Sequence, residues 1–185
     1  KIIFCSDNCF TELPAVLGCC TSLTMIGFKA NQIDVVPEDA LPPALRWLIL
    51  TDNRISVLPR SIGRCTQLQK LMLAGNQLSA LPDEMAACRE LELLRLAANR
   101  FAVLPDWLLA LPKLAWLALA GNPLNAAQEA AAQQQIDTIA YDSLVVGEQL
   151  GEGASGTIYR AQRAGQAVAL KLFKGEMTSD GLPLS

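Results

Sequence analysis

Apolar residues recur along this chain in a fixed pattern, with one asparagine in each copy. The asparagines are 22 or 23 residues apart and stand at Asn8, Asn31, Asn53, Asn76, Asn99 and Asn122. Apolar side chains precede each asparagine by three and five places, and from Asn31 onward also by eight, as Leu50, Leu48 and Leu45 do before Asn53. Side chains two apart point to the same side of a strand, so each copy predicts a short strand with one apolar face.

The asparagine follows each predicted strand and has a structural role there. Its amide donates and accepts hydrogen bonds, so it can pair backbone groups that the turn would leave unsatisfied in the interior. A single copy cannot bury its own leucines, whereas stacked copies bury one continuous core. The pattern therefore predicts stacked coils, with about six short strands in a curved parallel sheet and a ladder of interior asparagines.

Prolines mark the return path of each coil, six residues after the asparagine. They stand at Pro14, Pro37, Pro59, Pro82 and Pro105. Proline lacks a backbone donor, which steers the return segment away from strand pairing.

The period ends after Asn122. Asn125 and Gln128 form a start similar to a capping box, and the segment between residues 126 and 140 is rich in alanine and glutamine. We expect a helical cap and linker over 126–140 that covers the last strand, with an unstructured spacer as the alternative.

The spacing LxxLxLxxNxL at this period resembles the leucine-rich repeat family over residues 1–125. The resemblance implies an α/β fold, a leucine-rich repeat solenoid whose curved parallel sheet lines the concave side. Because the first copy lacks its leading leucine, we expect the chain to begin inside a longer parent.

The positions between the strand leucines should face the concave side. They are unusually apolar for an open surface, at Phe4, Met25, Trp47, Ile49, Met72, Leu93 and Trp116, with Lys29, Lys70, Arg54, Arg95 and Arg100 among them. Apolar patches with aromatic and arginine anchors are typical of protein interfaces. We predict a docking groove for a protein partner, with Trp47 and Trp116 as anchors. Packing against another part of the parent, or against a neighbouring molecule, is the alternative.

Charge and composition argue against other partners. The 185 residues are 51% hydrophobic and carry a formal charge of -3, which offers no electrostatic footprint for nucleic acid or an anionic membrane. No apolar run reaches the roughly 18 residues that span a bilayer. Histidine is absent, which removes histidine-based acid-base chemistry and mixed cysteine/histidine zinc sites.

The positions of the cysteines within the repeat indicate their roles. Cys20, Cys65 and Cys88 stand three residues before the next copy, where Leu111 stands later, so we predict small core residues. Cys5 occupies a strand core position. Without a CxxC pair we expect no metal site. Reduced thiols indicate a cytoplasmic protein.

The segment from residue 141 to residue 173 carries the only candidate chemistry. Gly151, Gly153 and Gly156 form GxGxxG, and Lys171 closes VALK fifteen residues later. Dinucleotide-binding folds also use GxGxxG, but there it leads from a strand into a helix. Here the sequence on both sides is typical of extended chain, with a turn at 164–166 before a strand over 167–173. An oxidoreductase is therefore a distant alternative.

This strand, glycine turn, strand, turn and lysine-bearing strand closely resembles the opening of a protein kinase amino-terminal lobe. The resemblance implies a glycine loop over the ATP phosphates, Leu150 and Ile158 beside the adenine, and Lys171 on the α- and β-phosphates. It assigns ATP binding to Leu150, Gly151, Gly153, Gly156, Ile158, Ala169 and Lys171.

The remaining kinase elements are not in this sequence. Kinase chemistry needs a glutamate on the next helix, an HRD aspartate and a DFG aspartate that holds magnesium. We therefore expect the 185 residues to be inactive by themselves, with residues 141–185 as the start of a kinase domain. The parent would be a serine/threonine-type kinase whose repeats recruit substrates or regulate the lobe. A non-catalytic leucine-rich-repeat scaffold is the alternative.

Overall fold

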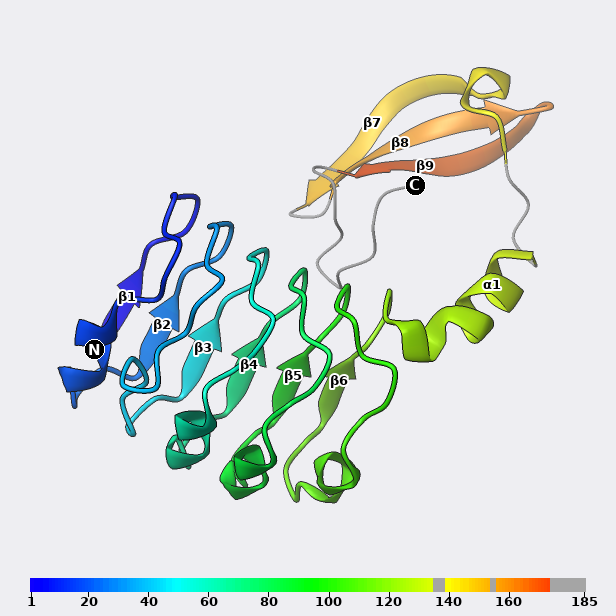
Figure 1. Cartoon of the computed structure of the whole chain (residues 1–185). Coiled ribbons are helices and arrows are strands. Elements are labelled where there is room, and N and C mark those ends of the chain that lie inside the picture. Colours follow the sequence, from blue (N-terminus) through cyan, green and yellow to red (C-terminus); the bar gives the residue numbers. More distant parts are fainter. Residues whose placement is uncertain (135–138, 154–155, 174–185) are drawn as a thin grey trace.

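The computed structural model describes residues 1–134, 139–153 and 156–173 and contains two separate sheets. The first is a parallel sheet of six strands that are neighbours in chain order (Figure 1). Its strands are β1 (Ile2–Phe4), β2 (Met25–Gly27), β3 (Trp47–Ile49), β4 (Lys70–Met72), β5 (Leu93–Arg95) and β6 (Trp116–Ala118). The predicted solenoid with six short parallel strands is confirmed.

The second sheet is antiparallel and has three strands. A short 3-10 helix, η6 (Tyr141–Ser143), precedes β7 (Val145–Gly153), which pairs with β8 (Gly156–Arg163). The third strand, β9 (Gln166–Phe173), pairs with β8 along its whole length.

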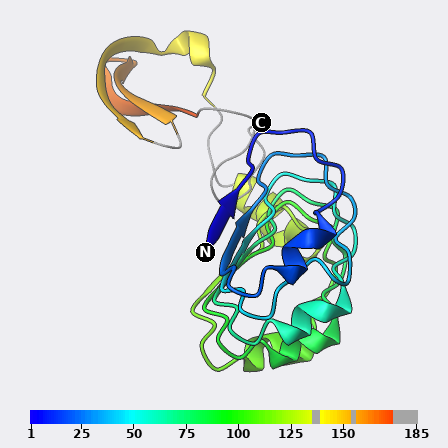
Figure 2. The ribbon, with the colours of Figure 1, turned by 90° about the vertical axis from the view of Figure 1, so that its left-hand side faces the viewer.

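Short 3-10 helices form the back of the coils. They are η1 (Ala15–Cys19), η2 (Arg60–Arg64), η3 (Asp83–Ala87) and η4 (Asp106–Ala110). Figure 2 looks along the stack and shows the strands on one side of the coil and these helices on the other. A repeat proline stands directly before each helix, at Pro14, Pro59, Pro82 and Pro105. The prolines therefore end the extended return segment where a helical turn begins, a detail that the sequence pattern does not predict.

One continuous core runs between the strands and these helices. The middle residues of the inner strands, Ile26, Leu48, Leu71 and Leu94, are fully buried. Burying a side chain of this size contributes about 1.5–3 kcal/mol before chain entropy is counted. The core exists only because neighbouring copies cover each other's leucines.

The asparagine ladder joins each coil to the one before it. The Asn76 amide donates from Nδ2 to the Leu50 carbonyl of the preceding copy at 2.9 Å and to the Leu73 carbonyl of its own copy at 3.0 Å. Its Oδ1 accepts from the Ile55 N–H, again in the preceding copy, at 3.0 Å. Asn53, Asn99 and Asn122 repeat these contacts, and all four side chains are buried.

The prediction of six interior asparagines is wrong at the amino-terminal end. Asn8 is exposed and donates only to the Ser6 carbonyl among its described contacts. Asn31 is half-buried but makes the ladder contacts to Cys5 and Phe10 of the preceding copy. The reason is the direction of the ladder. Each amide reaches back to an earlier coil, and no described coil precedes the one that contains Asn8.

A left-handed residue directly before each asparagine turns the chain. These residues have φ between 52° and 72° and are Asp7, Ala30, Asp52, Gly75, Ala98 and Gly121. Only two of them are glycines, although non-glycine residues carry a steric cost in this region. The backbone N–H of each of the first five donates to a carbonyl of the following copy, as Ala30 does to Thr51 and Ala98 does to Ala120, which the sequence pattern does not reveal.

The cysteine predictions hold in the middle of the stack and fail at its start. Cys65 and Cys88 are fully buried, and desolvation raises their thiol pKa values from 9.0 to about 11 and about 12. Cys5 is half-buried against the core. Cys20, predicted to be a core residue, is exposed, because no coil among the described residues lies before the first copy to cover it.

The carboxyl-terminal end of the solenoid is closed in part. A 3-10 helix, η5 (Pro123–Asn125), leads into α1 (Ala126–Gln134), so the predicted helix is present. Asn125 donates to the Leu119 carbonyl instead of capping α1, while Glu129 accepts from the Gly121 N–H. Leu117 and Leu119 stay partly exposed, so the last strand is covered only in part.

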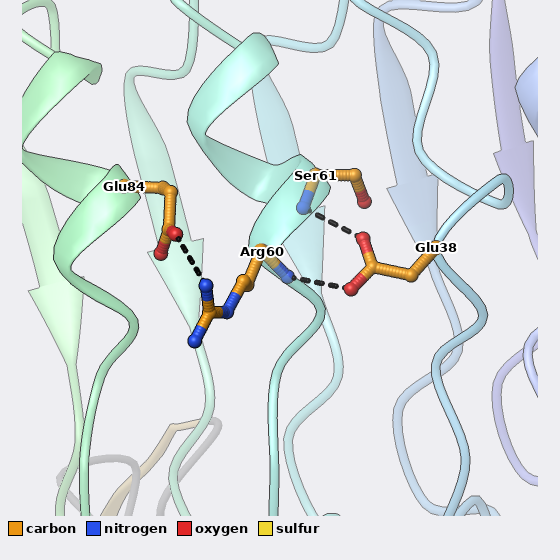
Figure 3. A network of polar contacts seen from close by, with 4 residues as sticks. All are labelled: Glu38, Arg60, Ser61 and Glu84. Carbon is orange, nitrogen blue, oxygen red and sulfur yellow. Dashed lines mark hydrogen bonds and ion pairs between the residues drawn. The ribbon is translucent and has the colours of Figure 1, made fainter.

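On the back of the solenoid, Glu38 caps the helix of the next copy (Figure 3). Its carboxylate accepts from the backbone N–H groups of Arg60 at 3.0 Å and Ser61 at 2.8 Å, which have no partner within η2. The Ser61 hydrogen bond is the largest cause of the lowered pKa of Glu38. The Arg60 guanidinium in turn forms an ion pair with the Glu84 carboxylate, with 3.5 Å between Nη1 and Oε1.

We expect Asn76→Ala to lower the free energy of unfolding by about 1–3 kcal/mol, because it leaves the buried Ile55 N–H without its acceptor. The Leu50 and Leu73 carbonyls each lose one of two amide donors and keep the bond from Asn53 or Asn99. Asn8→Ala is the matched control and should change it by less than about 0.5 kcal/mol. Urea unfolding followed by circular dichroism measures both. Equal effects of the two substitutions would contradict the assignment of the ladder.

We expect Glu38→Gln to lower the melting temperature at neutral pH, because an amide cannot accept from both N–H groups as a carboxylate does. The folded pKa lies below the ordinary 4.5, so the stabilisation is present above that value and is lost as the pH falls through the folded pKa. Melting curves from pH 7 to pH 3 should converge at the acidic end. Glu84→Gln, which removes only an exposed ion pair, should have little effect at any pH.

Candidate functional site

The candidate ATP-binding segment forms the two hairpins of the antiparallel sheet. β7 and β8 flank the glycine turn, whose residues 154–155 lie outside the described part of the chain. Ala164 and Gly165, at φ 49° and 83°, make the turn between β8 and β9. This turn is shorter than predicted, because Gln166 already pairs with Arg163. The predicted succession of strand, glycine turn, strand, turn and strand is present.

Strand register brings the candidate residues together in two rows. Gly151 pairs with Ile158, which pairs with Lys171 on the next strand. Gly153 pairs with Gly156, and Gly156 pairs with Phe173. Residues opposite each other on paired strands share a face, so Gly151, Ile158 and Lys171 lie on one surface.

The two remaining candidates lie beside these rows. Ala169 is two residues before Lys171 and therefore on the same face of β9. Leu150 lies where the β7 register shifts, between Gln149 and Gly151, and its side chain is 52% exposed. All seven predicted positions thus fall within one end of the sheet.

This sheet is open on both faces. Among the hydrophobic side chains described in its three strands, only that of Ala161 is buried. Leu150, Ile158 and Phe173 are exposed. The side chains on the face opposite Ile158, such as Tyr159 and Leu170, are only half-buried. The face that bears Lys171 is therefore accessible to a ligand.

Phe173 is a residue of this site that the motif does not include. The Lys171 ammonium lies 4.7 Å from the centroid of the Phe173 ring. A cation over an aromatic face is held by the ring quadrupole. The signal was available in the sequence, since Phe173 follows Lys171 by two residues and a strand places such pairs on one face.

Two glycines of the motif have different physical reasons to be glycine. A Cβ at Gly156 would collide with the backbone of Leu172 and Phe173, so the close approach of β9 requires glycine there. A Cβ at Gly151 would meet no described atom within 4 Å, and its φ is not in the left-handed region. Neither packing nor backbone conformation therefore explains why residue 151 is glycine. Close approach of a ligand to its backbone would explain it.

The second candidate surface is the concave face of the solenoid. The in-register sheet aligns Met25, Trp47, Lys70, Leu93 and Trp116 in one row across the strands. A parallel row contains Phe4, Gly27, Ile49, Met72, Arg95 and Ala118. The seven apolar residues predicted to bind a partner all lie in these two rows, and so does Arg95.

Exposure along the rows is greatest at the two ends. Phe4 is 55% and Trp116 is 53% exposed, while Trp47 is half-buried under the Lys70 ammonium, 4.0 Å from its ring centroid. Ile2, 59% exposed and paired with Met25, belongs to the same surface and was missed by the sequence pattern. Its place directly before the core residue Ile3 was the available signal.

Three of the cations expected among these residues lie off the strands. Lys29 follows β2, and Arg54 and Arg100 follow the asparagines Asn53 and Asn99. Arg54 and Arg100 are exposed and lie after the carboxyl-terminal ends of β3 and β5. Lys70 and Arg95 are therefore the cations that face outward from the sheet itself.

Other kinds of site are not found among the described residues. Residues 1–134, 139–153 and 156–173 contain no group of three or more histidine, cysteine, aspartate or glutamate side chains that could hold a metal ion. In the same ranges, no helix has the length and apolar character that a bilayer crossing requires.

The stacked coils, the parallel sheet and the asparagine ladder define a solenoid of leucine-rich repeats. The sequence matches the leucine-rich repeat family at residues 21–78, 43–101 and 66–124, which together span more than half of the chain. The chain belongs to this family, whose repeats serve as protein-interaction domains. No match was found among curated protein sequences.

Solved structures share the fold. The leucine-rich-repeat ectodomain of the receptor kinase SOBIR1 from Arabidopsis thaliana is 24% identical, with a TM-score of 0.54, over 65% of this chain and 69% of that one. An internalin, InlF, from Listeria monocytogenes is 24% identical, with a TM-score of 0.51, over 65% of this chain and 35% of that one. At this identity the likeness concerns the fold of the repeats.

We expect Gly156→Ala to open the β8–β9 hairpin and Gly151→Ala to leave it intact, because only the first adds an atom where the backbone of β9 lies. Amide hydrogen exchange of β8 and β9, measured by NMR spectroscopy, distinguishes the two variants. Fast exchange should appear in Gly156→Ala alone. Equal protection in both variants would show that Gly156 is not required by packing.

Proposed function

We propose that this chain joins a protein-docking solenoid to the ATP-binding sheet of a protein kinase of the serine/threonine type. In this proposal the repeats hold a protein partner or regulate the kinase, and the parent protein transfers the γ-phosphate of ATP with magnesium. The 185 residues supply the glycine loop and the lysine but none of the catalytic aspartates.

One observation carries the kinase part of the proposal. Gly151, Ile158 and Lys171 form a single row across three strands, on an exposed face that ends at the glycine hairpin. A nucleotide on this face would have its phosphates beside the glycine backbone and within reach of the Lys171 ammonium. Ile158 and Leu150 offer apolar contacts for the base.

The surroundings of Gly151 support this part of the proposal. Neither the backbone conformation nor the packing of the described residues requires glycine at this position. Backbone N–H groups bind phosphate oxygens best where no side chain intervenes. The open space beside Gly151 is where a phosphate would lie.

The concave face supports the docking part. Aromatic residues at both ends of its rows, Phe4 and Trp116, are more than half exposed, which is typical of interface anchors. We place the protein in the cytoplasm, where ATP is available and its six free thiols stay reduced.

We expect Lys171→Met to lower phosphate transfer by roughly 100-fold or more in the protein expressed from its complete gene, because the lysine holds the transferred phosphates in place. Transfer from radiolabelled ATP with magnesium to a generic protein substrate is the measurement. Lys113→Met, which removes an exposed lysine of the solenoid that lies off both candidate surfaces, is the matched control and should retain activity toward that substrate.

The non-catalytic scaffold is the competing function, and the same experiment separates the two. A complete gene that encodes neither an HRD nor a DFG segment after residue 185, together with no phosphate transfer by the wild-type protein, would overturn the kinase proposal. The docking role of the repeats would be unaffected by that result.

A further inference from the structure

The Lys171 ammonium has a single attractive side-chain neighbour among the described residues. This neighbour is the Phe173 ring, whose centroid lies 4.7 Å from Nζ. Within residues 1–134, 139–153 and 156–173, no carboxylate forms an ion pair with Lys171. Glu148 of β7 pairs with Arg160 instead, at 3.3 Å. The ring is therefore the contact that determines where the ammonium lies.

The strand register fixes the side of Lys171 on which the ring lies. Along β9, Ala169 and Phe173 are two residues from Lys171 in opposite directions, and both share its face. Alanine offers a cation no attractive group, whereas the face of an aromatic ring does. Phe173 pairs with Gly156, which in turn pairs with Gly153, so the ring stands at the glycine end of the sheet. The ammonium is thus held toward the end where the phosphates of the proposed nucleotide would lie.

Packing among the described residues does not account for an aromatic side chain at this position. The Phe173 side chain is exposed, on a sheet that is open on both faces. Its backbone, by contrast, is closely held, because a Cβ at Gly156 would lie only 3.0 Å from the Phe173 Cα. The close approach of β8 and β9 therefore fixes where the side chain begins, and the ring is left free to contact the ammonium.

We propose that Phe173 is a positioning residue, which holds the Lys171 ammonium at the glycine end of the sheet before a nucleotide binds. This inference rests on the ATP-binding function proposed above. An ammonium has three N–H donors, so it can face the ring and still donate to phosphate oxygens. A lysine side chain that is held in advance loses less conformational entropy on binding, which favours ligands that carry phosphate. Adenosine carries none and gains nothing from the ring.

The first test measures kinetics on the protein expressed from its complete gene, with ATP and magnesium. Phe173→Leu should raise KM for ATP about 2- to 5-fold and leave kcat within about 2-fold, because the lysine holds the phosphates equally before and during transfer. The inhibition constant of adenosine should not change. Phe173→Tyr keeps an aromatic face and should retain the wild-type KM.

The second test measures the contact itself by NMR spectroscopy, in the 185-residue chain without nucleotide. The ε-methylene signals of Lys171 are assigned by their loss in Lys171→Met. They should show nuclear Overhauser effects to the Phe173 ring protons and an upfield shift caused by the ring. Phe173→Leu should abolish both features, and Phe173→Tyr should retain them.

Leu172→Ala is the matched control for both tests. Leu172 is next to Phe173 and similarly exposed, at 38% against 44%, but it lies on the opposite face of β9. Its substitution should change neither the Lys171 signals nor KM for ATP. Circular dichroism verifies the fold of each variant. If Phe173→Leu is unfolded, Phe173→Met removes the ring with an unbranched side chain and should give the same rise in KM.

The results that would overturn this inference differ from those that would overturn the kinase proposal. An equal rise in KM for Phe173→Leu and Leu172→Ala, or a parallel loss of adenosine affinity, would show that Phe173 only stabilises the sheet. Absence of the ring contact in the wild-type chain would also refute the positioning role while phosphate transfer persists. Absence of phosphate transfer by the wild-type protein, with the ring contact present, would refute the kinase function and the role of the ring in it together.

Discussion

The asparagine amide that reaches back to the preceding coil is the interaction on which the solenoid depends. From Asn31 onward each amide bonds two groups of the earlier copy and one or two carbonyls of its own, so it fixes the distance and the register between coils. The leucines give the stack its stability without specifying how far one copy slides on the next. The amides make the sheet in register, and the aligned rows of the concave face follow from that.

The direction of this interaction explains why the two ends of the solenoid differ. At the start, Asn8 and Cys20 occupy repeat positions whose later equivalents are buried, yet both are exposed because the coil they would contact is not among the described residues. At the other end Asn122 is buried, because the coil it binds precedes it. A repeat position therefore acquires its environment from an earlier neighbour, and its own sequence does not determine it.

This directionality also sets what the sequence could reveal. The period predicted the strands, the sheet order and the burial of Cys65 and Cys88, because these follow from local alternation and from stacking. It could not predict the left-handed Ala30 and Ala98, whose conformation is imposed by contacts between copies. In the antiparallel sheet the motif identified Lys171 but not Phe173, because Phe173 lies outside the motif and only strand alternation places it on the face of Lys171.

The two sheets place functional residues under different constraints. In the solenoid, leucine and asparagine are fixed by stacking, so outward residues such as Lys70 are free to vary and can carry binding specificity. In the antiparallel sheet the same motif contains glycines with different roles, and the structure distinguishes them. Packing against β9 requires glycine at position 156, whereas a Cβ at Gly151 would meet no described atom within 4 Å. A ligand would explain the identity of a residue that folding does not require at its position, and Gly151 is such a residue.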